Sequence, residues 1–307
     1  MKKLLLLALV LLALLPCAQA QEEGTADFSL IYLPQFKSEL PEEVKETSGL
    51  FMHNGRLWTH NDSGGKPILY ALDTTTFEIV QRVTLANVKN KDWEDVCTDD
   101  EHVYVGDFGN NKGKRKNLRI YIFPLSELPT EGDASVTADS ITFRYADQTE
   151  FEFKKYEHDY DCESLFAGDS CLYIFSKCWK TGTTRLYRIP KTPGNYVIEP
   201  FNGFNSQGLI TGADYDRKNH VLVVVGYVKD IWLPFMYLIY DFDEAGVKLS
   251  HRRIEMPQLT GAQTEGICFF KEGMCYLSAE TSPTMTSRVF VTDFRKWINE
   301  ALKNKER

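Results

Sequence analysis

Short segments of alternating apolar and polar residues follow one another along most of the chain, and they come in a repeating order. Each repeat has an acidic or hydroxyl-bearing loop, a short inner strand, a turn, a second strand, a loop and a third strand of alternating pattern. The repeats begin near Glu46, Asp92, Asp161, Thr211 and Gln263. One unit that recurs at intervals of roughly 50 residues is typical of radially repeated β folds.

A fourth strand completes most repeats, and the pattern predicts it over residues 78–85, 140–145, 196–201 and 249–256. Four antiparallel strands per repeat predict the blades of a β-propeller. The last repeat lacks a fourth strand, which residues 28–36 can supply; this closes the ring and covers the sheet edges. Apolar residues at helical spacing after Asp293 predict a short C-terminal helix. We therefore expect one all-β propeller over residues 21–307 with five blades, or six if residues 149–160 contain a degenerate element.

The N-terminal residues have the pattern of a cleaved signal peptide rather than of a strand. Lys2 and Lys3 precede an apolar run over residues 4–15, and Ala18 and Ala20 form a small-x-small cleavage pattern. The run is shorter than the ~20 residues that a membrane-spanning helix needs. The sequence predicts a signal peptide over residues 1–20, cleavage after about Ala20, and a periplasmic or secreted protein. Lipidation at Cys17 is the weaker alternative, because Pro16 precedes it.

Composition and charge narrow the set of possible functions. The 19 Phe, 15 Tyr and 5 Trp favour strands, and a formal net charge of −8 argues against binding to nucleic acid, whose phosphates need a basic surface. Later segments are too short or too polar to span a membrane. Six cysteines follow the signal peptide, and the sequence cannot choose among their disulfide pairings; we expect Cys97 and Cys268 to be buried free thiols.

Four segments in the first two repeats resemble a known group of propellers. Residues 48–50, 57–64, 92–96 and 105–110 read SGL, LWTHNDSG, DWEDV and VGDFGN. They resemble secreted bacterial β-propellers of largely uncharacterised function, loosely related to phytase-like and NHL-type propellers. Some of these relatives are calcium-dependent phosphoesterases or lactonases, so the resemblance implies calcium-dependent hydrolysis as one function. It covers about residues 48–124, and neither a complete calcium-ligand set nor a catalytic histidine pattern transfers, so the fold transfers more safely than the function.

The repeats predict where chemistry is located. The first strand of a blade lies nearest the axis, so the residues at its start gather at one mouth of the central channel, here named the acidic mouth. Aligning the repeats stacks Ser48, Glu94, Glu163, Ala213 and Glu265 at one position. The residues two positions earlier in each repeat form a second, outer ring, and these are Glu46, Asp92, Asp161, Thr211 and Gln263. Crowded carboxylates must be protonated, paired or metal-bound. We predict Glu94, Glu163 and Glu265 as metal ligands, with calcium as the metal because the donors are oxygens.

The ends of the second strands add polar residues to the same mouth. These are Asn61, Asp62, Asp107, Asn110, Lys177 and Glu280. We predict Asn61, Asp62, Asp107 and Glu280 as ligand-binding residues, although turn chemistry alone explains Asn and Asp at such positions. A structural alternative applies to the whole ring: each acid accepts backbone N–H bonds from the neighbouring blade and holds the ring together. Repetition of the acids in several blades favours that alternative.

Three functions fit these observations. The first is a monomeric exported propeller that binds a small molecule, glycan or protein at its acidic mouth. The alternative is a calcium-dependent hydrolase of a phosphate ester or lactone. A glycan-active protein with paired carboxylates is the third. His60 is a weak candidate for a general base, and Ser63 lacks the Gly-x-Ser-x-Gly elbow of serine hydrolases. Trp179 and Trp232 either stack on a sugar ring or pack within loops.

Overall fold

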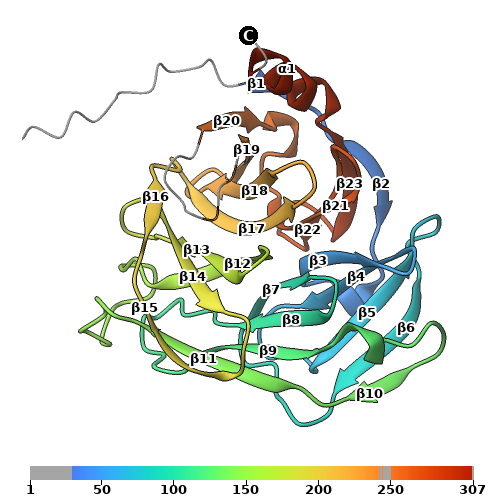
Figure 1. The fold of residues 1–307 in the computed structure, drawn as a ribbon. Helices are drawn as coiled ribbons and strands as arrows, with labels where there is room; N and C mark the ends of the chain where they lie inside the picture. The colour runs from blue at the N-terminus through green and yellow to red at the C-terminus, as the bar shows by residue number, and fades with distance from the viewer. Residues whose placement is uncertain (1–29, 241, 243, 245–249, 306–307) are drawn as a thin grey trace, which may run out of the picture.

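Five sheets surround a common axis in the computed structural model, which describes residues 30–240, 242, 244 and 250–305 (Figure 1). Each sheet is one blade, and its first strand lies innermost. The innermost strands are β3 (Thr47–His53), β7 (Trp93–Thr98), β12 (Asp161–Ala167), β17 (Leu209–Asp216) and β21 (Gln263–Lys271). Each of them contacts the next one around the ring, and β21 contacts β3. The prediction of an all-β propeller with five blades is confirmed.

The remaining strands build outward from the innermost ones. Blade 1 continues with β4 (Arg56–Asn61), β5 (Ile68–Asp73), β6 (Ile79–Leu85) and β10 (Ala134–Val136). Blade 2 continues with β8 (His102–Asp107), β9 (Leu118–Pro124), β11 (Asp139–Tyr145) and β15 (Gly194–Ile198). Blade 3 continues with β13 (Cys171–Lys177), β14 (Thr184–Pro190) and β16 (Asn202–Phe204).

Blades 4 and 5 are joined by the N-terminal strands. Blade 4 continues with β18 (Val221–Val228), β19 (Leu233–Tyr240), β20 (Ser250–Glu255) and β1 (Leu30–Ile31), and blade 5 with β22 (Met274–Glu280), β23 (Arg288–Asp293) and β2 (Gln35–Glu39). The antiparallel pairing of β2 with β23 closes the ring, as predicted, while β1 pairs in parallel with β20. The closing strand shares only residues 35 and 36 with the predicted range and continues to Glu39; residues 28 and 29 of that range fall outside the described part.

Two details of the strand prediction need correction. Residues 196–201 do not form the fourth strand of blade 3: β15 pairs in parallel with β11 of blade 2, and β16 takes the place beside β14. Alternation marks a strand but does not say which free sheet edge it joins. Residues 149–160 contain no strand, so the alternative of six blades is wrong.

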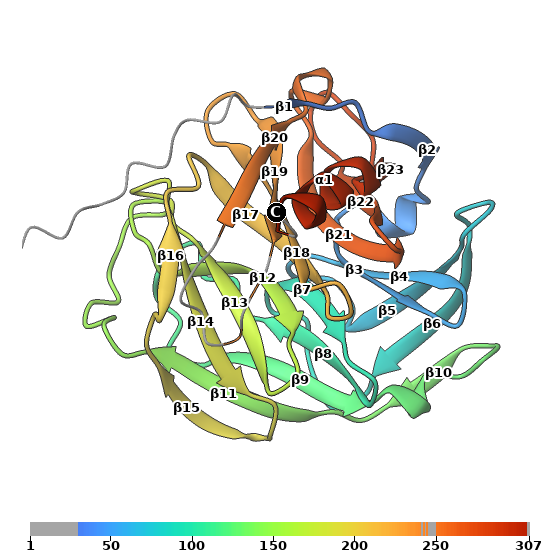
Figure 2. The same ribbon diagram turned by 45° about the horizontal axis from the view of Figure 1, so that its top comes forward.

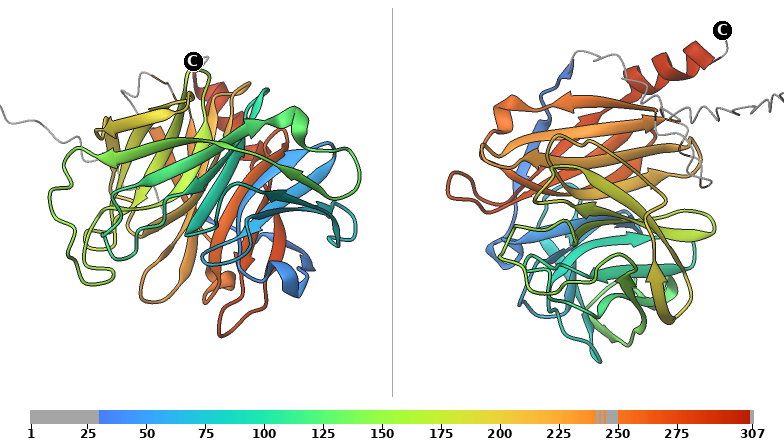
Figure 3. Two further views of the ribbon diagram at one scale, coloured as in Figure 1. Left: turned by 90° about the horizontal axis from the view of Figure 1, so that it is seen from below. Right: turned by 90° about the vertical axis from the view of Figure 1, so that its left-hand side faces the viewer.

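Apolar side chains fill the spaces between neighbouring blades. The largest fully buried ones include Trp58, Trp93, Tyr104 and Phe166. Each such side chain contributes roughly 1.5–3 kcal/mol when it leaves water. Figure 3 shows the ring edge-on, with hairpin loops at both of its faces. Because the sheets are packed rigidly against one another, the ends of the innermost strands are held in fixed positions around the axis.

The C-terminal helix and the cysteines agree with the sequence. Helix α1 (Arg295–Lys305) lies beside the last two blades (Figure 2), and Phe294 and Ile298 pack into the core between them. The six described cysteines are free thiols, and Cys97 and Cys268 are buried as predicted. Short 3-10 turns cover residues Glu42–Val44, Leu125–Glu127 and Pro257–Leu259. Within the described residues, the one α-helix is too short and too polar to cross a bilayer. The predicted signal peptide lies outside the described residues.

Candidate functional site

An irregularity in each innermost strand marks the acidic mouth. The pairing of each innermost strand with its neighbour shifts register near its start, and the residues in these β-bulges are Glu94, Glu163, Thr211, and the pairs Ser48–Gly49 and Glu265–Gly266. A bulge leaves the extra residue out of the regular ladder and re-aims its side chain. The five blades therefore present a bulged residue at the same height of the channel.

Blade 4 contributes Thr211 to this ring, so the alignment that placed Ala213 there is wrong. The Thr211 hydroxyl donates to the carbonyl oxygen of Thr264 at 2.6 Å, on the innermost strand of the next blade. The Ser48 hydroxyl makes the same type of bond to the Glu94 carbonyl. The alignment matched Asp214 with Asp95, and this shifted blade 4 by two residues.

Three carboxylates from blades 1 and 2 converge at the mouth. Asp62 follows β4, Asp92 precedes β7 and Glu94 lies on it, and one oxygen of each lies within 4.8 Å of the others. Oxygen Oδ1 of Asp62 is buried and has no hydrogen-bond partner among the described residues. The structure thus brings together Asp62 and Glu94, which the sequence singled out, with Asp92, which it placed in the outer ring.

Burial and mutual repulsion disfavour the charged forms of these three groups. Burial raises the pKa of Asp62 to about 8, and the charges of Asp92 and Glu265 add to the rise. Burial also raises the pKa of Asp92 to about 6, and that of Glu94 well above its ordinary value. Carboxyls that are this costly to ionise are stabilised by a cation.

The other side of the mouth holds a buried lysine among acids. The Lys177 ammonium forms an ion pair with Glu163, and both side chains are about 95% buried. Its Nζ lies 4.8 Å from the centre of the Trp179 ring and 5.2 Å from that of Tyr227. Burial raises the pKa of Glu163 well above its ordinary value, while Lys177 lowers it. This half of the mouth is therefore partly neutralised.

Glu265 and Glu280 complete the mouth on blade 5. The Glu280 carboxylate accepts a hydrogen bond from the Gln263 side chain. Burial raises the pKa of Glu280 to about 9, with Glu265 and Asp62 adding to the rise. Burial likewise raises the pKa of Glu265, against the lowering effect of Lys177. At neutral pH this blade supplies at least one carboxyl that keeps its proton.

Two predicted ligand-binding residues are engaged in other contacts. The Asn61 amide accepts a bond from the Glu46 N–H at 3.2 Å and donates to the Glu43 carbonyl at 2.7 Å. Asp107 pairs with Arg115 at 2.8 Å and accepts a bond from the Tyr121 hydroxyl at 3.1 Å. Their roles toward a ligand stay predictions.

The structural role proposed for the acids is filled by one of them, Asp161, and by two acids outside the predicted ring. Asp95 Oδ2 accepts the Leu165 N–H at 2.8 Å, and Asp214 Oδ2 accepts the Phe269 N–H at 2.7 Å. In both cases the donor lies on the innermost strand of the next blade. Asp161 also accepts backbone bonds, from Asn110 and Cys162. The sequence analysis did not single out Asp95 and Asp214 as acids that join neighbouring blades. An Asp inside an otherwise apolar strand could have indicated this role.

His60 and Trp179 serve as packing groups. His60 is fully buried with its ring edge-on to Trp93 at 5.5 Å, and burial lowers its pKa to about 4, so it stays neutral at pH 7. The Trp179 indole donates to Asp161 at 2.6 Å, and its ring lies 4.0 Å from that of Tyr156. Trp179 is mostly buried, which favours packing over sugar stacking.

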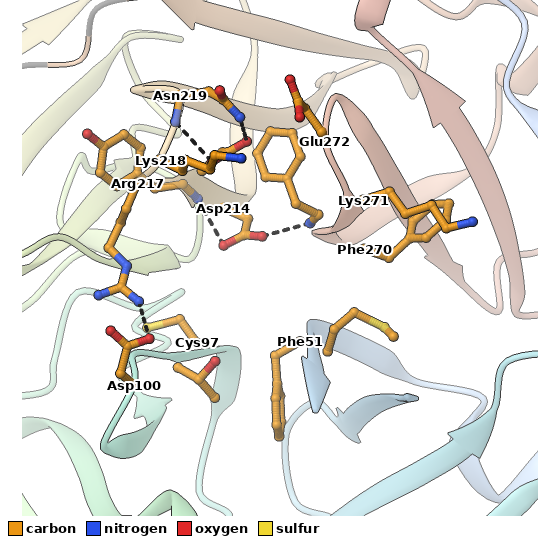
Figure 4. A pocket seen from close by; sticks show the side chains of 15 residues that line it. Phe51, Cys97, Asp100, Asp214, Arg217, Lys218, Asn219, Phe270, Lys271 and Glu272 are labelled. Carbon is orange, nitrogen blue, oxygen red and sulfur yellow. Dashed lines mark hydrogen bonds and ion pairs between the residues drawn. The ribbon is translucent and has the colours of Figure 1, made fainter. Parts of the chain in front are cut away.

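The far ends of the same strands border a cavity of about 710 Å³, here named the opposite mouth (Figure 4). Phe51, Cys97, Asp214 and Phe269 mark where the four strands β3, β7, β17 and β21 reach it. Arg217 pairs with Asp100 at 2.7 Å across its rim, and the Asp214 carboxylate is bonded to backbone N–H groups. The charges named here are thus already paired.

The comparisons with known proteins add a likeness in fold. No protein-family model matches the chain, and no curated protein does. Among solved structures it is similar to a glucose dehydrogenase (10% identity, TM-score 0.48, 83% of this chain and 98% of that one). It is also similar to a mannose phosphorylase from Leishmania mexicana (10%, 0.46, 88% and 91%) and to the WD40 propeller domain of Doa1 (12%, 0.34, 85% and 69%). Similarity at this level carries no information on activity.

Proposed function

We propose that the protein binds a divalent cation, calcium, at the acidic mouth, with Asp62, Asp92 and Glu94 as the protein ligands. The convergence of their oxygens within 4.8 Å carries this proposal. Calcium–oxygen bonds are about 2.4 Å long, so two ligands on opposite sides of the ion are about 4.8 Å apart. Three carboxylates with this spread can therefore surround one ion. A donor set made only of oxygens suits calcium or magnesium rather than zinc or copper.

The buried, unpartnered Oδ1 of Asp62 supports the same proposal, because a buried polar atom without a partner is costly. A bound cation would supply that partner and would lower the pKa of all three carboxyls. Glu163 and Glu265, predicted from the sequence as metal ligands, face Lys177 and interact with it. In this proposal Glu163 and Glu265 add negative charge near the ion. Their direct binding to the ion stays a prediction.

Thermal unfolding of the protein with calcium or with a chelator tests the proposal. A ligand that binds only the folded state at 100 times its Kd stabilises it by about 2.7 kcal/mol, so calcium should raise the midpoint by several degrees. Glu94→Gln should remove most of that rise. Glu127→Gln is the matched control, since its side chain is exposed and lies in a turn of blade 2. Equal midpoints with calcium and with chelator would refute the cation site.

A second candidate function is calcium-dependent hydrolysis of a phosphate ester or lactone. Glu280 favours it, because this carboxyl lies in the mouth outside the three-residue cluster and burial raises its pKa to about 9. A carboxyl that is protonated at neutral pH can act as a general acid next to a cation that polarises the substrate. Chromogenic phosphate esters and lactones, assayed with calcium, test this. Glu280→Gln should abolish turnover and leave the calcium-induced rise in midpoint intact.

A further inference from the structure

A second cavity, of about 600 Å³, lies next to the acidic mouth and has the opposite charge. One wall is the connection from blade 1 to blade 2, residues 86–91, and the other is formed by blade 2. Its cations are Lys89, Lys91, Arg115 and Arg119, and its one carboxylate is that of Asp107. In a chain with a net charge of −8, this concentration of positive charge is a local exception.

Arg115 is the fixed element of this cavity. Its Nη2 donates to the carboxylate and the carbonyl oxygen of Asp107, both at 2.8 Å, and its Nη1 donates to the Gly109 carbonyl at 2.9 Å. The side chain is 91% buried, and within the described part of the chain its Nε has no hydrogen-bond partner. A guanidinium held by three bonds is pre-organised, so it loses little entropy when an anion binds.

Three cations of the cavity remain without an acidic partner. Asp107 neutralises Arg115, whereas Lys89, Lys91 and Arg119 form no ion pair with any described residue. Arg119 lies over the Tyr121 ring, with 6.0 Å between its guanidinium carbon and the ring centre. Cations at the wall of one concave site attract an anion more strongly than the same charges spread over a surface. Three uncompensated charges match a doubly charged oxyanion better than a single carboxylate.

The cavity and the acidic mouth are adjacent at Gly109. Gly109, whose carbonyl binds Arg115, is so close to the mouth that a Cβ there would lie 1.8 Å from Glu94 Oε1 and 2.6 Å from Asp92 Cγ. The backbone of Gly109 therefore lies between the cation site and the basic cavity, and the two sites are adjacent.

We propose that this cavity binds a phosphate group. The ligand of the acidic mouth would then be a phosphorylated small molecule, anchored here by its phosphate. The assignment of the ligand class rests on the proposed cation site, whereas the phosphate site itself does not. Arg115, which comes from the basic run at residues 112–116, thereby gains a function.

Calorimetric titration with inorganic phosphate, in chelator and at constant ionic strength, tests the proposal. Phosphate should bind the wild-type protein, and Lys89→Gln with Lys91→Gln should weaken binding at least tenfold. Both lysines are exposed, so the double variant should fold normally. Lys37→Gln with Lys154→Gln removes the same charge from exposed sites elsewhere and should leave the Kd unchanged.

Three results would overturn the phosphate site: equal binding by the two double variants, no heat of binding to the wild type, or equally tight binding of acetate. Constant ionic strength keeps general screening the same in every titration. Because calcium is absent, failure here leaves the cation site untouched. Conversely, phosphate binding in a protein that calcium does not stabilise would remove the cation site alone.

Discussion

The two mouths of the channel are built from opposite ends of the same innermost strands, yet their carboxylates differ. At the opposite mouth, Asp214 accepts two backbone N–H groups and Asp100 pairs with Arg217. Asp99, nearby, is bonded to Lys191 and to the Tyr104 hydroxyl. At the acidic mouth, Asp62, Asp92 and Glu94 face one another, and among the described residues no hydrogen bond to the carboxylates of Asp92 or Glu94 is formed.

The pKa values of Asp99 and Asp62 express the same difference, whereas burial raises the pKa of Asp214 to about 6 in spite of its backbone hydrogen bonds. Burial alone would raise the pKa of Asp99, but its hydrogen bonds from Lys191, the backbone and Tyr104 bring it down to about 2. Burial raises the pKa of Asp62 to about 8, Asp92 and Glu265 add to the rise, and a backbone hydrogen bond from Ser63 and the charge of Lys177 offset it only in part. The comparison teaches that a large number of acids does not by itself indicate a functional site. An acid becomes a candidate when its carboxylate lacks hydrogen-bond and ion-pair partners. Carboxylates bonded to the N–H groups of the next blade, such as those of Asp95 and Asp214, hold the ring, whereas those that lack partners can bind a ligand.

The largest expected effect is a loss of stability, and it distinguishes two adjacent residues of β7, Asp95 and Glu94. Asp95→Ala removes the acceptor of the Leu165 and Val96 N–H groups, which are buried between blades 2 and 3. A buried donor without a partner costs about 1–3 kcal/mol, so the variant should lose about 3 kcal/mol or more of its free energy of unfolding. Urea unfolding in chelator measures this.

Glu94→Gln is the matched control, since it changes the neighbouring carboxylate without removing an acceptor that the fold uses. It should be neutral or stabilising in chelator, because it relieves repulsion from Asp62 and Asp92. If Glu94→Gln costs as much stability as Asp95→Ala, the distinction between ring-holding and ligand-binding acids is wrong.

Per pH unit, a smaller effect appears in the pH dependence of the metal-free protein. The pKa of Asp62 is about 8 in the folded protein and that of Glu280 about 9, both above their unfolded values. The folded state therefore binds more protons than the unfolded state between about pH 5 and 8. The free energy of unfolding must fall as pH rises, by about 1.4 kcal/mol per pH unit for each extra proton. The charged groups that act on Asp62 are Asp92, Glu94, Glu265, Glu280 and Lys177.

Asp62→Asn should flatten this slope between pH 6 and 8, as measured by chemical unfolding at each pH. Calcium should act in the opposite sense, because its ligands must lose their protons; its stabilising effect should grow with pH. Asp99→Asn gives the contrasting profile: the pKa of Asp99 is lowered, so its contribution is present above about pH 4 and lost as pH falls toward 2. A slope that Asp62→Asn leaves unchanged would contradict the assigned pKa shift.

The fold could be predicted from the sequence because strands and turns leave local patterns that repeat. Five repeats, ring closure by the N-terminal segment and the final helix all follow from periodicity. The partners of the outer strands could not be predicted. Residues 194–198 extend blade 2 although they lie in sequence between β14 and β16 of blade 3, since any strand can add to a free sheet edge.

The site could be predicted only in outline. Repeat alignment located the acidic mouth, because bulges occur at the same place in every blade. It could not tell Asp95 from Glu94, since partners such as the Leu165 N–H come from another blade, 70 residues away. It also placed Asp107 at the mouth without its partner Arg115, and it therefore missed the basic cavity.

The smallest expected effect lies at the rim of the opposite mouth. Asp100→Asn breaks the ion pair with Arg217, but the Asp100 side chain is 86% exposed. Exposed ion pairs contribute about 0–1 kcal/mol, so the midpoint should move by no more than a degree or two. Calcium and phosphate should act on this variant as they do on the wild type. If Asp100→Asn abolished the calcium-induced rise in the unfolding midpoint, the two mouths would be coupled through the channel. The distinction between partnered acids at one mouth and ligand-binding acids at the other would then be wrong.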